Sequence, residues 1–199
     1  MVVIKYKKTG LGAFIGEEEM LDCWNRVMNR AGLNLDEGDF KLKLFHPAPL
    51  GIESNKEYLI VNTSLNEDKV KIKIQELFPD WIEIVDCYRL DDFDLLFGYK
   101  TRDILHVSIA NMHACKNSIE EAFNLLKNEG KVIDYSFEDK WLKVAISSIL
   151  SNSMCDIVDE ILRKNNIRGF TIIREKLLLE NDALMEVDSF LEEEMKGVN

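Results

Sequence analysis

The order of predicted strands and helices occurs twice in this chain, and it constrains the fold more than any other feature. The first half reads strand, helix, strand, strand, helix, strand, and the second half repeats this order without repeating the residues. This is the order of the ferredoxin-like split βαβ unit, in which two helices cover one face of a four-stranded antiparallel sheet. We therefore predict an α+β fold of two tandem ferredoxin-like (βαββαβ) units, residues 1–91 and 92–180, followed by a C-terminal helix in residues 181–199.

A hairpin predicted for residues 40–61 anchors the first unit. Residues 41–45 (KLKLF) alternate polar and apolar side chains, as a half-buried strand does. Residues 57–61 (EYLIV) have the aromatic and β-branched composition of a second strand. The connecting loop contains Pro47 and Pro49, which cannot donate backbone hydrogen bonds to a sheet, so strand pairing should stop where the loop begins.

Two helices are predicted in the first unit. A helical stripe of apolar residues follows an acidic start and ends at Gly32, which is typical of a helix C-terminus. Residues 66–78 fit both a strand and a helix. We predict a helix there, because Asn66 provides a start signal and Pro79 an end.

The remaining elements follow from the same periodicities. Further strands are predicted at residues 2–8, 82–90, 104–110, 131–137, 141–147 and 170–179. The helices of the second unit carry the apolar residues Ile119, Ala122, Phe123 and Leu126, and then Met154, Ile157, Val158 and Ile161. The C-terminal helix has a thin apolar stripe that either docks on a sheet face or awaits a partner, and it consists of Leu184, Val187, Leu191 and Met195.

Composition limits the setting in which the chain works. It is 46% hydrophobic and 31% charged, with a net charge of −11. No apolar run approaches the roughly 20 residues of a membrane span, and the start lacks the apolar core of a signal peptide, so we expect a cytoplasmic protein without membrane contact. Because the acidic balance repels phosphate backbones at long range, RNA binding would require a local basic patch.

Four motifs in the first half resemble the radical-SAM-linked family, a bacterial domain of unknown function that is fused to, or encoded beside, radical SAM proteins. They are Phe14-Ile15, Arg30-Ala31-Gly32-Leu33, Pro47-Ala48-Pro49-Leu50-Gly51-Ile52-Glu53-Ser54 and Glu57-Tyr58-Leu59. The chain departs from the family pattern at residues 16–19, where Ser-His-Leu-Asp is usual, and at residues 36–39, where a longer polar loop is usual. It therefore resembles a divergent member.

The resemblance implies a non-catalytic accessory or binding protein that works beside a radical SAM protein or in RNA metabolism. One alternative is a direct RNA-binding or RNA-processing module, and another is a small-molecule enzyme that uses the Pro47–Ser54 loop. The cysteines are too widely spaced to hold an iron–sulfur cluster, so any radical chemistry belongs to a partner. We predict no cofactor for this chain.

The proline-rich loop supplies the candidate binding residues. It is long for a hairpin loop, and two prolines stiffen it, so it can present a surface to a partner. The candidates are His46, Pro47, Pro49, Gly51, Glu53 and Ser54. The alternative is that Glu53 and Ser54 form hydrogen bonds within the loop itself.

We predict no metal site and no catalytic residue, although two groups of side chains invite the question. His106, His113 and Cys115 offer imidazole and thiolate ligands suited to zinc but lack a fourth ligand. We place His106 on a strand and the other two in a turn, where Cys115 would need a neighbouring histidine to act as a nucleophile. The second group offers carboxylates for Mg²⁺ or Ca²⁺ without the glycine and glutamate of a calcium loop, so a solvated linker is favoured for Asp91, Asp92 and Asp94.

A basic stripe is the remaining candidate for RNA binding. Ferredoxin-like sheets bind RNA with exposed aromatic residues flanked by basic ones, although the usual RNA-recognition signature is absent here. The simpler interpretation is that charged side chains protect sheet edges from aggregation. The stripe would consist of Lys5, Tyr6, Lys7, Lys8, Lys41 and Lys43.

Overall fold

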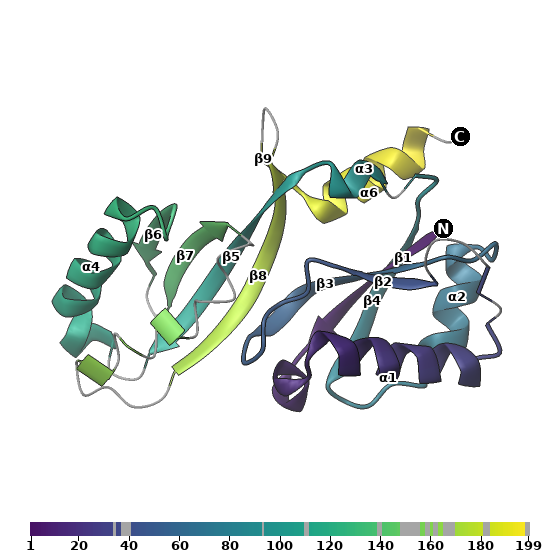
Figure 1. Cartoon of the computed structure of the whole chain (residues 1–199), viewed down its shortest axis with the longest axis horizontal. Coiled ribbons are helices and arrows are strands. Elements are labelled where there is room, and N and C mark those ends of the chain that lie inside the picture. Colours follow the sequence, from purple (N-terminus) through teal and green to yellow (C-terminus); the bar gives the residue numbers. More distant parts are fainter. Residues whose placement is uncertain are drawn as a thin grey trace.

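A computed structural model gives the fold of the chain (Figure 1). It describes residues 1–33, 35–36, 41–92, 94–109, 112–138, 141–147, 156–157, 160, 163–164, 170–180 and 184–197. The strands are β1 (Val2–Lys8), β2 (Leu42–Phe45), β3 (Glu53–Val61), β4 (Ile82–Arg89), β5 (Lys100–Ile109), β6 (Asp134–Phe137), β7 (Leu142–Ser147), β8 (Phe170–Glu180) and β9 (Leu184–Glu186). The helices are η1 (Gly10–Phe14), α1 (Glu17–Arg30), α2 (Glu67–Ile74), α3 (Asp94–Phe97), α4 (Met112–Asn128) and α6 (Val187–Gly197).

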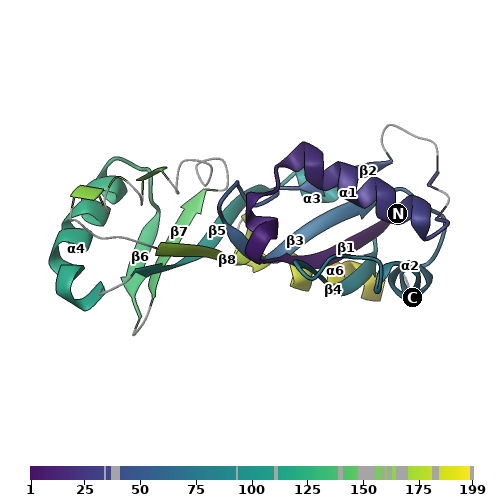
Figure 2. The same cartoon turned by 90° about the horizontal axis from the view of Figure 1, so that it is seen from below.

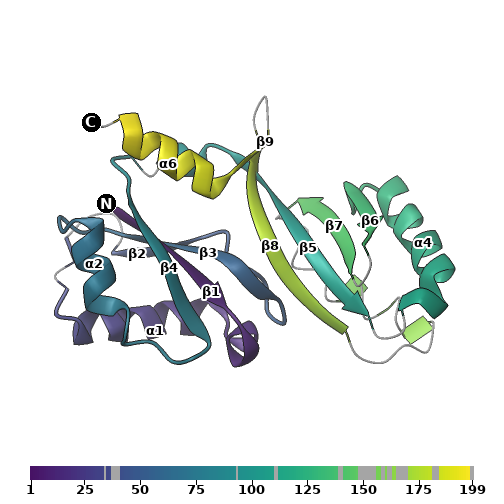
Figure 3. The same cartoon turned by 180° about the vertical axis from the view of Figure 1, so that it is seen from behind.

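The described strands form one nine-stranded sheet that runs through both halves of the chain (Figure 3). Its order is β4-β1-β3-β8-β5-β7-β6, with β2 also paired to β3 and β9 to β8. The halves meet where Glu53 and Ser54 of β3 pair in parallel with Ile173 and Arg174 of β8. The predicted α+β class and C-terminal helix are confirmed. The pairs within each half are antiparallel, as predicted, whereas the parallel pair that joins the halves into one sheet was not predicted.

Both faces of the first-half sheet are covered, because side chains along a strand alternate between them. One face carries Val2, Ile4 and Tyr6 of β1 and packs against Trp24 of α1 and Ile74 of α2. The opposite face is covered by α6 and α3 (Figure 2). Its buried residues include Val3, Phe45, Tyr58, Ile60, Tyr88, Leu96, Val187, Phe190 and Leu191.

The second-half sheet packs one face against α4. Leu105 and Val107 of β5 and Val144 of β7 form an apolar cluster with Ile119 and Phe123 of the helix. The helix begins at Met112, seven residues before the first apolar position in the predicted stripe. The helix predicted around residues 154–161 lies largely outside the described residues.

The ambiguous segment at residues 66–78 is helical, as predicted. Asn66 caps α2, because its side-chain oxygen accepts a hydrogen bond from the backbone N–H of Lys69 at 3.0 Å. The helix ends at Ile74, before Pro79. No helix within the described ranges is long and apolar enough to cross a membrane.

The C-terminal helix docks on the first-half sheet rather than on the half that precedes it. Asp188, in its first turn, accepts hydrogen bonds from Lys5 Nζ at 2.8 Å and Tyr58 Oη at 2.9 Å, and it also pairs with Lys56. Burial disfavours the charged carboxylate, but the hydrogen bonds from the two lysines outweigh burial and hold the pKa of Asp188 below its ordinary value. This ion cluster ties the end of the chain to its beginning.

Replacing Asp188 with asparagine should lower the free energy of unfolding at pH 7 by about 2 kcal/mol, because two partly buried lysines lose their counter-charge. A depressed carboxyl pKa stabilises the fold above the unfolded value of about 3.9 and loses that effect as pH falls through the folded value. The difference between wild type and Asp188→Asn should therefore shrink in acid, as urea denaturation at pH 7 and pH 3 would measure. Asp134→Asn, which affects an exposed ion pair, is the control. A difference that does not depend on pH would contradict this role.

Candidate functional site

The predicted proline-rich loop borders a hollow of about 190 Å³. The walls come from the end of β1, the start of α1 and the loop between β2 and β3. Because β3 begins at Glu53 rather than at Glu57, this loop spans only residues 46–52. Pro47, Pro49 and Leu50 of the loop face the hollow.

Two buried ionisable residues, Lys8 and Glu57, hold the loop through hydrogen bonds to its backbone. Lys8 Nζ donates a hydrogen bond to the carbonyl oxygen of Ala48 at 2.8 Å. The Glu57 carboxylate accepts one from the backbone N–H of the same residue, with N···O distances of 3.2 and 3.3 Å. The exposed fractions of Lys8 and Glu57 are 2% and 1%, and burial lowers the pKa of Lys8. Both backbone polar groups of Ala48 are therefore held by buried side chains.

Arg174 of β8 extends this network across the junction between the halves. It is 1% exposed, and its guanidinium pairs with Glu57 at 2.5 Å and with Asp103 of β5 at 3.5 Å. It also donates hydrogen bonds to Ser54 Oγ at 3.1 Å and to the carbonyl oxygen of His46 at 2.6 Å. Burial opposes the charge, but the two carboxylates raise the pKa of Arg174, so the guanidinium stays protonated.

The polar candidate residues of the loop take part in hydrogen bonds that hold the loop in place. Ser54 is fully buried on β3, where its hydroxyl oxygen accepts hydrogen bonds from Arg174 and from the backbone N–H of Lys56. Glu53 accepts one from the backbone N–H of Gly10 at 3.0 Å. His46 is a non-glycine residue with a φ of 43°, and Gly51 has a φ of 85°, which suits a residue without a Cβ. Glu53 and Ser54 therefore have structural partners, but these partners lie on η1, β3 and β8 and not within the loop as the alternative predicted.

Apolar side chains are exposed beside the hollow. Leu11 and Phe14 of η1 are 74% and 67% exposed, and Leu50 of the loop is 60% exposed. The backbone N–H of Gly51 donates a hydrogen bond to the carbonyl oxygen of Ala13 at 2.7 Å, which brings the loop against η1. Leu50 Cδ1 would lie 3.8 Å from a Cβ placed on Gly16, so this side chain also reaches the start of α1. The exposed residues therefore belong to two adjoining segments, η1 and the loop.

Two of the metal-ligand candidates, His106 and Cys115, lie on opposite faces of the second-half sheet. His106 lies on β5 with its ring 6.0 Å from that of Trp141, on the face opposite the one that α4 covers. His113 and Cys115 belong to α4, so the turn predicted for them is wrong. Cys115 packs against the apolar cluster beneath that helix. No group of three or more potential ligands occurs within the described residues.

The predicted linker contains a short helix. Asp94 begins α3, and Asp92 Oδ1 accepts a hydrogen bond from its backbone N–H at 2.9 Å. Asp91 lies 3.8 Å from Arg89 Nε. The linker aspartates therefore start a helix or form an exposed ion pair, and they do not form a group of ligands.

Four of the five lysines of the predicted basic stripe have intramolecular partners. Lys5 pairs with Asp188, Lys7 with Glu83 at 3.0 Å, and Lys8 with Ala48. Lys43 Nζ lies 3.8 Å from the centre of the Phe97 ring, and Lys41 is exposed. The aromatic residues that an RNA-binding sheet would expose are buried here beneath α6 and α3: Phe45, Tyr58 and Tyr88 are 0%, 1% and 5% exposed.

Residues 2–97 match the family described as "Uncharacterized protein conserved in bacteria (DUF2344)". The first half of the chain is similar to this family. The match contains β1, η1, α1, the loop and β3, which are the elements around the hollow. The DUF2344 description assigns no activity, and it mentions no radical SAM protein.

No curated protein matches this chain. Among solved structures, it is similar to "Crystal structure of putative glycine cleavage system transcriptional repressor", with 10% identity over 87% of this chain and 96% of that chain. The TM-score of 0.24 is too low for an argument from that structure.

Sequence reasoning found the loop but missed the groups that hold it and the surface beside it. Arg174 and Asp103 come from strands far along the chain, so no local spacing connects them to the loop. A signal for Arg174 was present, because it occupies an inward position next to Ile172 in an apolar strand. Leu11 and Phe14 gave no such signal, since a short turn has no apolar periodicity.

Proposed function

We propose that this chain is a non-catalytic accessory protein that binds a partner protein in the cytoplasm. The binding site is the η1 surface, formed by Leu11, Phe14, Ile15 and Leu50. The observation that carries the proposal is the exposure of Leu11, Phe14 and Leu50 on two adjoining segments, where Ile15 and Leu50 line the hollow. Adjacent large apolar side chains on a protein surface mark contacts with partners, whereas single ones need no explanation.

The roles of the ionisable groups support binding rather than catalysis. Lys8 and Glu57 hold the backbone of Ala48, and Arg174 holds Glu57 and Ser54. Ionisable side chains that are held in these contacts make the loop rigid, and a rigid binding surface loses less conformational entropy when a partner binds. The alternative of a small-molecule enzyme would use the same hollow, where these side chains already have structural partners.

We infer further that the chain is built from two ferredoxin-like units, residues 1–91 and 92–180, with residues 181–199 as an added segment. Numbered within its own half, each group of four strands has the order 4-1-3-2, as β4-β1-β3-β2 and β8-β5-β7-β6. Every neighbouring pair within a half is antiparallel. The binding surface then lies on the first unit, at the end where β8 of the second unit joins it.

The resemblance to the radical-SAM-linked family makes a radical SAM protein the first partner to test. Immobilised wild-type protein should retain a radical SAM protein from an extract of the source cell. Phe14→Ser should reduce that retention by about tenfold, because burying a phenylalanine contributes about 1.5–3 kcal/mol. Mass spectrometry of the bound fraction measures the effect.

Ile72→Ser is the matched control, since Ile72 is 76% exposed on α2 and lies outside the η1 surface. It should retain as much partner as wild type. Equal retention by Phe14→Ser and Ile72→Ser would refute the η1 surface as the binding site. Failure of the wild-type protein to retain any radical SAM protein would refute that choice of partner.

A further inference from the structure

We propose that the partner segment bound at the η1 surface is cationic and amphipathic, with large apolar side chains interspersed with lysine or arginine. This inference rests on the proposed function and adds the chemical class of the partner. It follows from the charges that surround the surface and from the hollows on either side of it.

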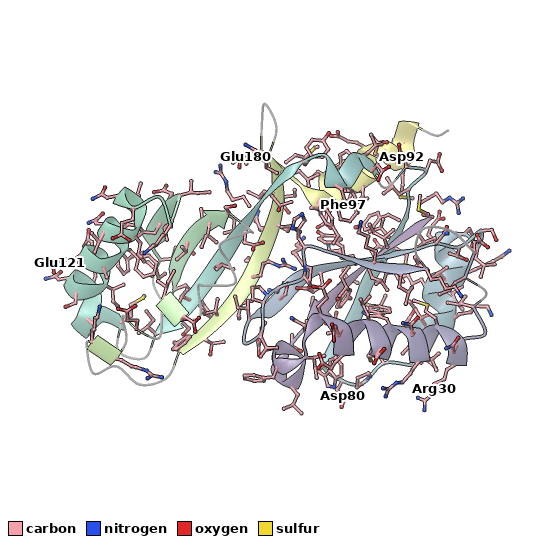
Figure 4. The ribbon with its side chains drawn as sticks, viewed as in Figure 1. Arg30, Asp80, Asp92, Phe97, Glu121 and Glu180 are labelled. Carbon is pink, nitrogen blue, oxygen red and sulfur yellow. The ribbon has the colours of Figure 1, made fainter. Side chains whose placement is uncertain are left out.

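The chain around the η1 surface is acidic. Residues 9–25 contain no lysine or arginine, and the loop residues 44–55 contain none either. The exposed charges of the first two turns of α1 are all negative, and they are Glu17, Glu18, Glu19 and Asp22. The cations of α1 come later, with Arg30 at the far end of the helix from η1 (Figure 4). Lys8 and Arg174, which contact the loop, are both buried and bound to its backbone carbonyl oxygens.

Two hollows flank Ile15 and suit apolar anchors. The hollow of about 190 Å³ lies on the loop side and is lined in part by Ile15, Met20 and Leu50. The other, of about 620 Å³, lies between α1 and the segment that follows α2. Ile15, Leu77 and Trp81 line it, and its charged lining comes from α1, with Glu19 and Asp22 in the first turns and Arg26 and Arg30 in the later turns. The hollow on the loop side, where the exposed charged residue is Glu17, and the part of the second hollow at the start of α1 therefore combine apolar walls with carboxylates, as a segment with apolar and basic side chains requires.

The same charges disfavour a nucleic acid or a second copy of this chain at the η1 surface. A phosphate backbone would meet Glu17, Glu18 and Glu19 beside η1, whereas the accessible cations Arg26 and Arg30 lie in the later turns of α1. A second copy of this chain would bring its own acidic surface and a net charge of −11. Charge complementarity therefore selects a basic segment of a different protein, since like charges placed together oppose association.

The test is a selection from a random phage-displayed library of short peptides against the full-length protein. Enriched peptides should carry at least two large apolar residues and a net positive charge. Synthetic copies, measured by fluorescence anisotropy, should bind Phe14→Ser about tenfold more weakly than wild type. They should bind Glu18→Lys about three- to tenfold more weakly, and the affinity should fall as salt is raised.

Two control variants keep the result specific. Ile72→Ser removes an equally exposed apolar side chain, and Glu121→Lys reverses an exposed charge on α4 in the second half (Figure 4). Both should bind the selected peptides as wild type does. Far-ultraviolet circular dichroism and thermal unfolding should show that all four variants are folded, since each change is at an exposed position.

The possible failures are distinguishable. Neutral or acidic peptides that still depend on Phe14 would overturn the cationic class and leave the proposed binding surface intact. Peptides indifferent to Phe14→Ser, or no enrichment at all, would overturn both. A wild-type dimer that Phe14→Ser converts to a monomer in sedimentation experiments would assign the surface to a second copy and also overturn the inference.

Discussion

Replacing Arg174 with methionine is expected to lower the free energy of unfolding by about 3–5 kcal/mol, because two buried carboxylates would lose the guanidinium that pairs with both. Glu57 and Asp103 are 1% and 0% exposed, and Arg174 contacts both. The substitution would also remove the donors to Ser54 Oγ and to the carbonyl oxygen of His46. Urea denaturation at pH 7, followed by circular dichroism, measures the effect.

Arg102→Met provides the control within the same sheet. Arg102 of β5 pairs with Glu180 at 2.8 Å, but the Glu180 side chain is 38% exposed. Losing this ion pair should lower the free energy of unfolding by only about 1 kcal/mol or less. Neutralising the carboxylates in the triple variant Arg174→Met, Glu57→Gln, Asp103→Asn should restore part of the lost stability, since the two buried carboxylates would be replaced by neutral amides. A small effect of Arg174→Met, or no restoration in the triple variant, would show that the network is not a buried charge cluster.

This network gives the proposed binding loop a dependence on the second half of the chain. Arg174 lies on β8, whereas the loop and Glu57 lie in the first half. The guanidinium holds His46 at one end of the loop and Ser54 just beyond the other. A fragment that ends near residue 91 would lack this support, so the η1 surface should be studied in the full-length protein.

The local elements of the fold could be predicted because each depends on a nearby pattern. Alternation marked the strands, helical stripes marked α1 and α4, and Asn66 marked the start of α2. The parallel pairing of β3 with β8 could not be predicted, since it joins residues about 120 positions apart through only two residue pairs. The position of α6 was similarly open, because an apolar stripe does not specify which sheet face it covers.

The candidate site was predicted in part for the same reason. Pro47, Pro49 and Gly51 mark a rigid turn by their own chemistry, wherever the turn packs. The partners of Lys5 and Lys8 depend on tertiary structure, and one lysine pairs with Asp188 while the other contacts Ala48. From the alternation alone, both lysines are interpreted as charged residues at strand edges. In the structure, Lys5 holds α6 and Lys8 holds the loop. A lysine that keeps a strand edge soluble and a lysine that supports the tertiary structure therefore give the same pattern in a single sequence.

Leu191→Ala is expected to lower the free energy of unfolding by about 2–5 kcal/mol, because it leaves a cavity in a packed core. Leu191 is fully buried where α6 covers the first-half sheet, in a cluster with Tyr58, Ile60 and Tyr88. A free helix awaiting a partner would tolerate this change with little loss. Urea denaturation of the full-length protein therefore distinguishes the two roles that the apolar stripe of this helix allowed.

Glu193→Ala is the matched control, because Glu193 is exposed on the same helix. Both substitutions introduce alanine, which favours helices, so a difference between them reports burial and not helix propensity. Glu193→Ala should leave stability within about 0.5 kcal/mol of wild type. Equal effects of the two variants would mean that α6 does not pack on the sheet in solution. The aromatic residues Phe45, Tyr58 and Tyr88 would then be exposed, and the sheet face would again be open to RNA.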